Sequence, residues 1–367
     1  MTGKVRAHID TITTGVYRYP TPEPEADGTL TWDATIAVTV EIKAGGMKGL
    51  GWTYSSPAAA TVIHEHLSSA IRELDPLDVA ACWSAMHRAC RNIGTRGLVM
   101  QAISAVDIAL WDLKAHLLNA SLSGLFGAVR SSVLVYGSGG FTTLNEDQLA
   151  LQVQQWSDAG CTAMKIKIAE RWGDQVDRDL RRVQQLHELA DDGVELMVDA
   201  NGGYTRGQAR RIGRALDELG VVWFEEPVSS DDVEGLGLVR GAVTCDVAAG
   251  EYAADLYEVR RLIDVVDCLQ LDVTRCGGYT GWLRGAAFAA AHNLDVSAHC
   301  APSLHAPVAA AAPNLRHIEW FVDHARLEPQ LVDGCPVVRE GFLHLDASVS
   351  GHGMRISPRA ARYCLTS

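Results

Sequence analysis

The stretch VVWFEEPVSS, residues 221–230, places an apolar, strand-like run directly before Glu225, Glu226 and Pro227. A buried carboxylate is unfavourable unless it has a partner. Two carboxylates at the end of a strand that is otherwise apolar therefore indicate that at least one of them belongs to a set of interacting groups.

Similar β-branched runs recur along the chain and alternate with amphipathic helical stretches. The runs are SVLVYG (132–137), AMKIKI (163–168), ELMVDA (195–200), VVWFEEP (221–227), DVAAGE (246–251), CLQLDV (268–273), LDVSAH (294–299) and RHIEW (316–320). Eight such units at this spacing are typical of a closed parallel barrel. An open doubly wound sheet is the competing interpretation, but no GxGxxG motif follows the first run. We predict an α/β fold with a TIM-like barrel over residues 131–328.

The flanking segments have a different pattern. Residues 29–44, TLTWDATIAVTVEIKA, alternate as an antiparallel strand does, and residues 57–127 have helical spacing. This predicts an α+β capping domain over residues 1–130. Before the first of these, YRYPTPEPEADG (17–28) is typical of a mobile Pro-rich loop. The tail, residues 329–367, reverts to turns and short strands, and we expect it to return to the capping domain.

Bulk composition excludes several classes of protein. The formal net charge is −13, which opposes binding to nucleic acid or to an anionic membrane. Nine scattered cysteines without a CxxC pair indicate reduced, mostly buried thiols rather than a disulfide framework. The first ten residues, MTGKVRAHID, lack the apolar region of a signal peptide, and no run is long enough to span a membrane. We expect a soluble, cytoplasmic protein.

Three carboxylates end successive strands of the predicted barrel. Asp199, Glu225 and Glu251 are separated by 26 and then 26 residues, so closure of the barrel would bring them to neighbouring points of its rim. Three such charges repel one another unless a cation lies between them. Ligation by oxygen alone points to Mg²⁺ rather than zinc. The alternative is that each carboxylate caps a helix or pairs with a surface arginine.

Two further groups of ionisable residues end strands. Alternation in KIK places Lys165 and Lys167 on one side of their strand. Each ammonium would lower the pKa of the other, so that one lysine could act as a neutral base near pH 7. Asp272 and His299 end neighbouring strands and could form an acid/base pair. Glu319, on the eighth strand, could contact a bound oxygen or form a salt bridge.

In order and spacing, these motifs resemble the enolase superfamily, and in particular its mandelate racemase subgroup. The resemblance rests on AISAVDIALWDLKA, KIK, VDAN, FEEP, AGE, LQLDVTRCGGYTGWLR, SAH and IEW. It implies a modified (β/α)7β barrel with the capping domain packed over it. It also implies Mg²⁺ on Asp199, Glu225 and Glu251.

The resemblance also implies roles for the other strand-end residues. Lys167 would be one base, and the His299–Asp272 pair the acid/base on the opposite face. Lys165 and Glu319 would bind the substrate carboxylate, with Glu319 protonated if it donates, and Asn201 would lie near a substrate hydroxyl. The family's closing loops would fall near residues 17–28 and 49–56. Alternation points Glu226 away from Glu225, so we assign Glu226 a supporting role rather than a ligand role.

The resemblance implies a reaction that begins with removal of the proton α to a carboxylate. We favour dehydration of a sugar acid to a 2-keto-3-deoxy acid, with the roles of Lys167 and His299 open to exchange. Racemisation or epimerisation of a 2-hydroxy acid is the first alternative, and a barrel that only binds metal and ligand is the second. Cycloisomerisation is disfavoured because such relatives usually carry a lysine where this chain has Asp272. Assembly as a homo-oligomer is expected from the resemblance alone.

Overall fold

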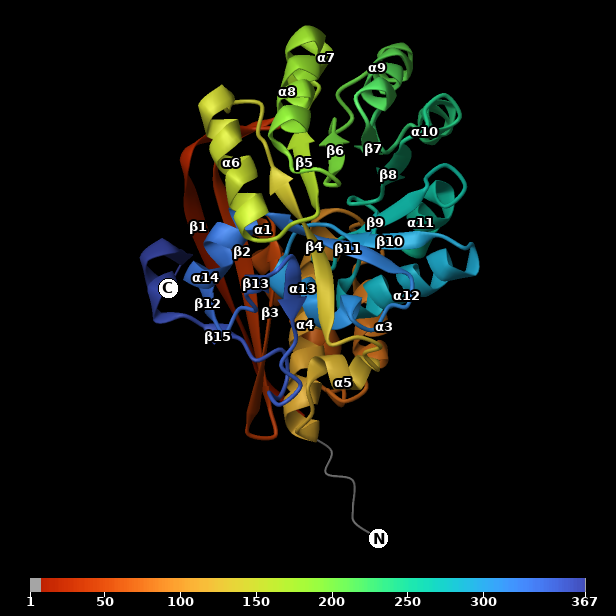
Figure 1. Cartoon of the computed structure of the whole chain (residues 1–367). Coiled ribbons are helices and arrows are strands. Elements are labelled where there is room, and N and C mark those ends of the chain that lie inside the picture. Colours follow the sequence, from red (N-terminus) through yellow and green to blue (C-terminus); the bar gives the residue numbers. More distant parts are fainter. Residues whose placement is uncertain (1–7, 367) are drawn as a thin grey trace.

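The computed structural model describes residues 8–366, and eight parallel strands form a closed barrel at its centre. The last strand pairs with the first, which closes the barrel (Figure 1). The strands are β4 (Ser132–Gly139), β5 (Ala163–Lys167), β6 (Glu195–Asp199), β7 (Val221–Glu225), β8 (Asp246–Ala249), β9 (Cys268–Leu271), β10 (Asp295–Ala298) and β11 (Leu315–Phe321). Each of the eight predicted runs forms one of them, and the predicted fold class is confirmed.

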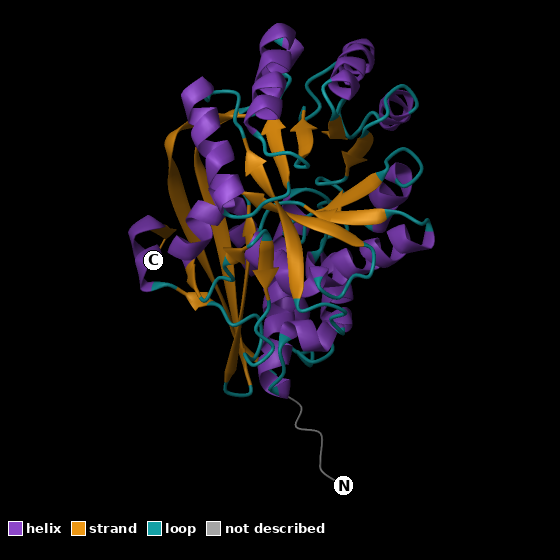
Figure 2. Cartoon of the chain, in the orientation of Figure 1, coloured by secondary structure: helices purple, strands orange, loops and turns teal. Residues whose placement is uncertain are grey.

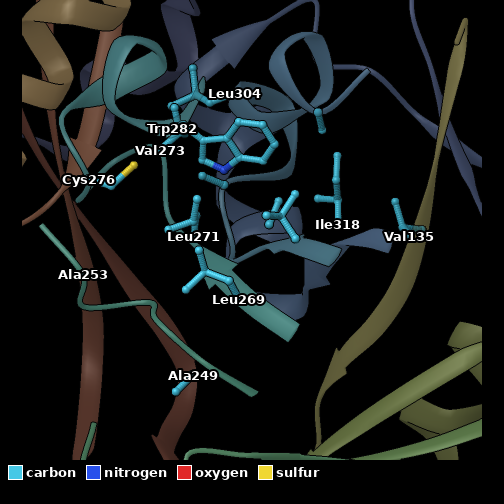
Figure 3. Packing of buried hydrophobic residues seen from close by; sticks show 14 of the residues in the cluster. Val135, Ala249, Ala253, Leu269, Leu271, Val273, Cys276, Trp282, Leu304 and Ile318 are labelled. Carbon is cyan, nitrogen blue, oxygen red and sulfur yellow. The ribbon is translucent and has the colours of Figure 1, made fainter. Parts of the chain in front are cut away.

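Helices surround the barrel, and an antiparallel sheet lies beside it (Figure 2). The surrounding helices are α6 (Glu146–Asp158), α7 (Glu170–Gly173), α8 (Val176–Leu189), α9 (Arg206–Glu218), α10 (Val233–Arg240), α11 (Leu256–Leu262), α12 (Gly278–Ala291), α13 (Pro302–Ala309) and α14 (Val322–Leu331). Trp282 of α12 and Leu304 of α13 belong to the same buried cluster as Leu271 and Ile318, which face outward from the barrel (Figure 3).

Side chains that point into the barrel change character along its axis. Toward the N-terminal ends of the strands the interior is mainly apolar and forms a small cluster of its own, made of Tyr136, Ala163, Met197, Trp223, Ala248 and Cys268. Two residues further along β5, β6 and β7, the inward positions carry Lys165, Asp199 and Glu225. The period-2 alternation of strands therefore places ionisable groups at one end of a packed core.

The capping sheet consists of β1 (Ile9–Ala26), β2 (Thr31–Ala44) and β3 (Met47–Tyr54), with β16 (Cys364–Thr366) on its outer edge. Its helical part comprises α1 (Ala58–Val62), the π-helical turn η1 (Ile63–Leu67), α2 (Ser68–Ile71), α3 (Val79–Ala89), α4 (Leu98–Leu118) and α5 (Leu122–Phe126). Gly49 and Gly51 let β3 approach α4 closely, since a Cβ on Gly49 would lie 2.1 Å from the carbonyl oxygen of Ala109.

The predicted mobile loop at residues 17–28 is wrong for most of its length. Strand β1 continues to Ala26, and its pairing with β2 shifts register between Pro20 and Glu25. Proline cannot donate a ladder hydrogen bond, but it is tolerated at bulges and on edge strands. The shift accommodates the Pro-rich stretch, and the turn proper is confined to residues 27–30.

The C-terminal tail contacts both parts of the molecule. Its short elements are β12 (Val332–Asp333), β13 (Val338–Arg339), β14 (Phe342–His344), β15 (Arg355–Ile356) and a 3₁₀ helix over Pro358–Tyr363. Strand β14 pairs with β4 of the barrel, whereas β16 pairs with β1 of the cap at Val16 and Tyr17. The domain boundaries at 130 and 328 stay a prediction, and residues 1–7 and 367 lie outside the described residues.

Two smaller observations bear on the predicted class of protein. None of the helices between residues 8 and 366 combines the length and apolar character that a membrane crossing requires. No disulfide joins any of the nine cysteines, all of which lie in this range, and seven of the nine are buried.

Candidate active site

Three carboxylates from successive strands lie together at the C-terminal end of the barrel. Asp199 ends β6, Glu225 ends β7, and Glu251 follows β8. Their ligand oxygens all lie within 4.8 Å of one another, and all three side chains are buried. Burial and the charge of Asp199 raise the pKa of Glu225 to about 8. Oε2 of Glu251 has no hydrogen-bond partner among the described residues, so this all-oxygen set fits a hard divalent cation.

Lys165 and Lys167 point into the barrel from β5, as the alternation in KIK predicts. Nζ of Lys165 lies 2.6 Å from Oε2 of Glu225 and 2.8 Å from Oε1 of Glu319. Lys167 forms an ion pair with Asp199. Each lysine is therefore already paired with the carboxylate cluster.

The predicted lowering of a lysine pKa is wrong for the site as it stands. Burial is the largest effect and acts to lower the pKa of Lys167, but the carboxylates of Asp199, Glu319 and Glu225 together outweigh burial and Lys165, so this pKa is raised. For Lys165, the charges of Glu225 and Glu319 likewise outweigh burial. The clustered carboxylates supply more negative charge than the two lysines supply positive charge.

His299 and Asp272 form a hydrogen-bonded pair just beyond the ends of β10 and β9. Nδ1 of His299 lies 2.8 Å from Oδ2 of Asp272, and Nε2 lies 3.3 Å from Oε2 of Glu251. Burial acts to lower the pKa of His299, but the charges of Glu251 and Glu319 and the bond with Asp272 raise it. The imidazole can therefore hold a proton on Nε2 and release it to a bound molecule.

Sequence analysis did not identify Arg275, which joins two parts of the site. Its Nη1 lies 2.8 Å from Oε1 of Glu251, and its Nε lies 3.3 Å from Oδ2 of Asp272. Burial acts to raise the pKa of both carboxyls, but the positive charges of His299 and Arg275 lower both. Its position three residues after Asp272, within the TRCGG motif, was the available signal.

Glu319 is an ionised acceptor in this structure. Ser138 Oγ donates to its Oε1 at 2.6 Å, and the backbone N–H of Cys300 donates to its Oε2 at 2.9 Å. Burial acts to raise the pKa of Glu319, but the positive charges of Lys165, His299 and Lys167 together outweigh burial and hold this pKa well below its usual range. The predicted donor role therefore requires a proton that Glu319 does not carry here.

Asn201 follows Asp199 by two residues and lies beside it. Its backbone N–H donates to Oδ1 of Asp199 at 2.8 Å. Its side-chain Oδ1 is buried and has no partner within residues 8–366. An unpaired amide oxygen of this kind can accept a hydrogen bond from a hydroxyl, so the predicted contact with substrate stays a prediction.

Glu226 lies in the same charge cluster as Glu225, contrary to the prediction from alternation. Its φ of 38° is left-handed, and this breaks the extended geometry that would point it away. Burial, followed by the charges of Glu251, Asp199 and Glu225, raises its pKa well above the usual range. A non-glycine residue in this conformation costs about 1–3 kcal/mol and is typical of functional sites.

The turn between β1 and β2 lies over this end of the barrel. The N–H of Thr142 donates to the carbonyl of Ala26 at 2.8 Å, and the N–H of Trp172 donates to that of Gly28 at 2.9 Å. Thr142 lies in the loop that follows β4, and Trp172 lies in α7, which follows β5. The first predicted closing segment is therefore in contact with the rim.

The second predicted segment, residues 49–56, is mainly the end of β3 rather than a loop. Thr53 Oγ1 donates to the carbonyl of Thr274 at 2.9 Å. The ring of Tyr54 stacks on His324 with centroids 3.7 Å apart, and its hydroxyl donates to Glu328. This segment thus fixes the capping sheet to the loop that follows β9 and to helix α14, which follows β11.

Replacing Arg275 by Gln should destabilise the protein by about 3 kcal/mol at neutral pH, because two buried carboxylates lose their cation. Urea unfolding measures this, with Arg275→Lys as a partial rescue and exposed Arg210→Gln as the control. The folded pKa of Glu251 is lowered to about 2, so its stabilisation is present above the unfolded value of about 4.3 and is lost as the pH falls. A difference in unfolding free energy between wild type and Arg275→Gln that stays constant from about pH 3 to about pH 7 would contradict this assignment.

Two family models match the chain. Residues 11–127 match the model described as mandelate racemase / muconate lactonizing enzyme, N-terminal domain. Residues 148–360 match the model described as enolase C-terminal domain-like. All the strand-end residues named above fall within the second match.

Named relatives include a dehydratase and a cycloisomerase. L-talarate/galactarate dehydratase of Salmonella typhimurium is 33% identical over 298 residues, which cover 79% of this chain and 74% of the relative. The 3,6-anhydro-alpha-L-galactonate cycloisomerase of Streptomyces coelicolor is 32% identical over 340 residues, which cover 89% of this chain and 93% of the relative.

Solved structures agree with these matches over nearly the whole chain. A mandelate racemase/muconate lactonizing enzyme-like protein from Rubrobacter xylanophilus has 41% identity and a TM-score of 0.94, covering 97% of this chain and 99% of its own. The Salmonella dehydratase, solved with Mg and L-lyxarohydroxamate, has 28% identity and a TM-score of 0.91, covering 100% and 95%. The resemblance is confirmed: the chain belongs to the mandelate racemase / muconate lactonizing enzyme family of the enolase superfamily.

Proposed function

We propose that the protein is a Mg²⁺-dependent hydro-lyase that dehydrates a sugar acid to a 2-keto-3-deoxy acid. The observation that carries the proposal is the presence of two separate proton-transfer groups at one carboxylate cluster. Lys167 pairs with Asp199, while Nε2 of His299 faces Glu251. A base and an acid at different points of one site suit an elimination, in which one proton is removed and another is delivered.

Asp199, Glu225 and Glu251 would hold the Mg²⁺, which when bound stabilises negative charge on a substrate carboxylate. Ligation also removes the charge of Asp199 from Lys167. Burial and the neighbouring Lys165, which both act to lower the pKa of Lys167, would then dominate. The predicted neutral base thus becomes available in the loaded enzyme.

In the proposed reaction, Nζ of Lys167 takes the proton from C2 of the substrate. Lys165 and Glu319 contact the substrate carboxylate, whose negative charge raises the pKa of Glu319 and favours its donor form. His299 gives the proton on Nε2 to the 3-hydroxyl, the C3–O bond breaks, and water leaves. The enol product then takes a proton at C3 and becomes the 2-keto acid. Asn201 would accept a hydrogen bond from a substrate hydroxyl.

A cycloisomerase relative favours a second candidate function. In a substrate whose C3 oxygen belongs to a ring, the same elimination opens the ring and releases no water. The cycloisomerase of Streptomyces coelicolor matches this chain over 93% of its own length, and this similarity favours cycloisomerisation despite Asp272. Lys167 and His299 would keep their roles.

The decisive experiment is a panel of mono- and dicarboxylic sugar acids, with their anhydro and lactone forms, assayed with Mg²⁺ for 2-keto-3-deoxy products. Turnover of open-chain acids supports dehydration, and turnover of cyclic substrates alone supports the second candidate. Deuterium incorporation at C2 from D₂O without a keto product would overturn both and indicate a racemase or epimerase. No reaction and no exchange would favour the barrel that only binds.

Trp32, on the strand that leaves the hairpin turn, anchors this turn to the rim. Its ring meets Phe141 edge to face with centroids 5.4 Å apart, and it packs on the buried cluster of Phe141, Cys300 and Phe321. Trp32→Ala should raise KM about tenfold with little change in kcat, since a partly buried aromatic contact contributes about 1.4 kcal/mol. Steady-state kinetics measure this, and Tyr257→Ala, at a side chain 75% exposed, is the control. A fall in kcat at constant KM would contradict an anchoring role.

A further inference from the structure

Beside the carboxylate cluster, a second set of side chains converges on Nε2 of His299. Sγ of Cys300 lies 3.3 Å from this nitrogen, and Oε2 of Glu319 lies 3.7 Å from it. The ligand atoms of His299, Cys300 and Glu319 all lie within 4.8 Å of one another, and all three side chains are buried. Unlike the first cluster, this one contains nitrogen and sulfur.

The separations suit one small cation. Tetrahedral zinc has Zn–S of about 2.3 Å and Zn–N and Zn–O of about 2.0–2.2 Å, which places its ligand atoms about 3.3–3.6 Å apart. The distances from Nε2 to Cys300 and Glu319 are close to this range.

Local geometry orients the His299 ring and the Cys300 sulfur toward each other. The bond from Nδ1 of His299 to Asp272 fixes the ring and leaves Nε2 as the ligand atom, an arrangement typical of metal-binding histidines. Adjacent residues in a strand point to opposite sides. A left-handed φ of 51° at Cys300 breaks that alternation, so its sulfur lies beside the imidazole.

We infer that His299, Cys300 and Glu319 form a second cation site that takes a divalent metal of the zinc class. A sulfur ligand selects for such metals and against Mg²⁺, which prefers oxygen. A metal bound there occupies Nε2 of His299 and blocks its proton transfer, so the site is inhibitory. The inhibition rests on the proposed function, whereas the binding does not.

The test is a titration of the Mg²⁺-loaded protein with Co²⁺, followed by absorption spectroscopy and then by displacement with Zn²⁺. Sulfur ligation gives a thiolate-to-cobalt charge-transfer band, which we expect for the wild type and for Cys90→Ala, a matched change at a buried cysteine in the cap. Cys300→Ala should lack the band. Its turnover should require at least about tenfold more Zn²⁺ for half-inhibition, because losing even a supporting group weakens metal binding about 10–100-fold.

Two results would overturn the inference. One is the absence of a charge-transfer band in the wild type. The other is inhibition of Cys300→Ala at the wild-type Zn²⁺ concentration, which would place the inhibitory metal on Asp199, Glu225 and Glu251 instead. Failure of the proposed function would appear differently, as lack of turnover on every substrate with the cobalt spectrum intact.

Discussion

Lys167→Met should lower kcat by about 10²–10⁴-fold, the usual contribution of a positioned general base or acid. The pKa of the C–H α to a carboxylate is on the order of twenty units above that of a lysine that acts near neutral pH. The reaction therefore needs a base positioned next to this proton. Methionine keeps most of the length and apolar contacts of the side chain and removes only the ammonium. Steady-state kinetics on the best substrate of the panel measure the loss, with exposed Lys43→Met as the control.

His299→Asn separates the two proton transfers. If Lys167 takes the C2 proton, this variant still exchanges that proton with D₂O but forms no keto product, whereas Lys167→Met exchanges nothing. If Lys167→Met exchanged the proton and His299→Asn did not, His299 would be the base and Lys167 the acid, an assignment that depends on the C2 configuration of the substrate. Wild-type turnover in either variant would exclude that residue from the chemistry.

Glu225→Gln should abolish the response to Mg²⁺ and lower turnover at least about 10³-fold, because one of three ligand carboxylates is lost. In the wild type, Mg²⁺ at about 100 times its Kd should add about 2.7 kcal/mol of stability. Thermal unfolding with Mg²⁺ and with EDTA measures this difference. The Mg²⁺-dependent stabilisation should be near zero in Glu225→Gln. In this variant Lys165 also loses one of its two close carboxylate partners.

Glu226→Gln is the matched control on the adjacent residue. Burial and the charges of Glu251, Asp199 and Glu225 raise the pKa of Glu226 well above its usual range, which favours the neutral carboxyl that Gln resembles in charge and shape. We expect the Mg²⁺-dependent thermal shift to survive in this variant. If the thermal shift were lost in Glu226→Gln and kept in Glu225→Gln, Glu226 rather than Glu225 would be the metal ligand.

The barrel was predictable because each strand carries its own local signal. The apolar runs are short and β-branched, and parallel strands buried on both faces have this composition wherever they occur. Alternation then placed Lys165 and Lys167 on one side of their strand, and the spacing of the strand ends placed Asp199, Glu225 and Glu251 at neighbouring points of the rim. The Pro-rich stretch before Gly28 was misjudged because a register shift in the β1–β2 pairing lets prolines stay in a strand, and a register shift depends on the partner strand.

The unpredicted features of the site depend on backbone dihedrals and on the sum of charges. Alternation fails at Glu226 because φ turns left-handed one residue beyond the strand. The pKa of Lys167 was misjudged because a pairwise argument with Lys165 omitted Asp199, the larger effect. Arg275 was missed because the TRCGG motif does not show which groups the arginine contacts, and only the fold brings it between Glu251 and Asp272.

The pairing of β16 with β1 has a consequence for synthesis of the protein. Strand β1 leads into the hairpin turn that contacts the barrel rim. On the side away from β2, β1 pairs with residues 364–366 at Val16 and Tyr17. During translation this edge therefore stays unpaired until residues 364–366 have been synthesised. An unpaired edge can associate with other chains, so expression should be sensitive to deletion of residues 364–366. A nascent chain halted before this strand should be more prone to aggregation than one that includes it.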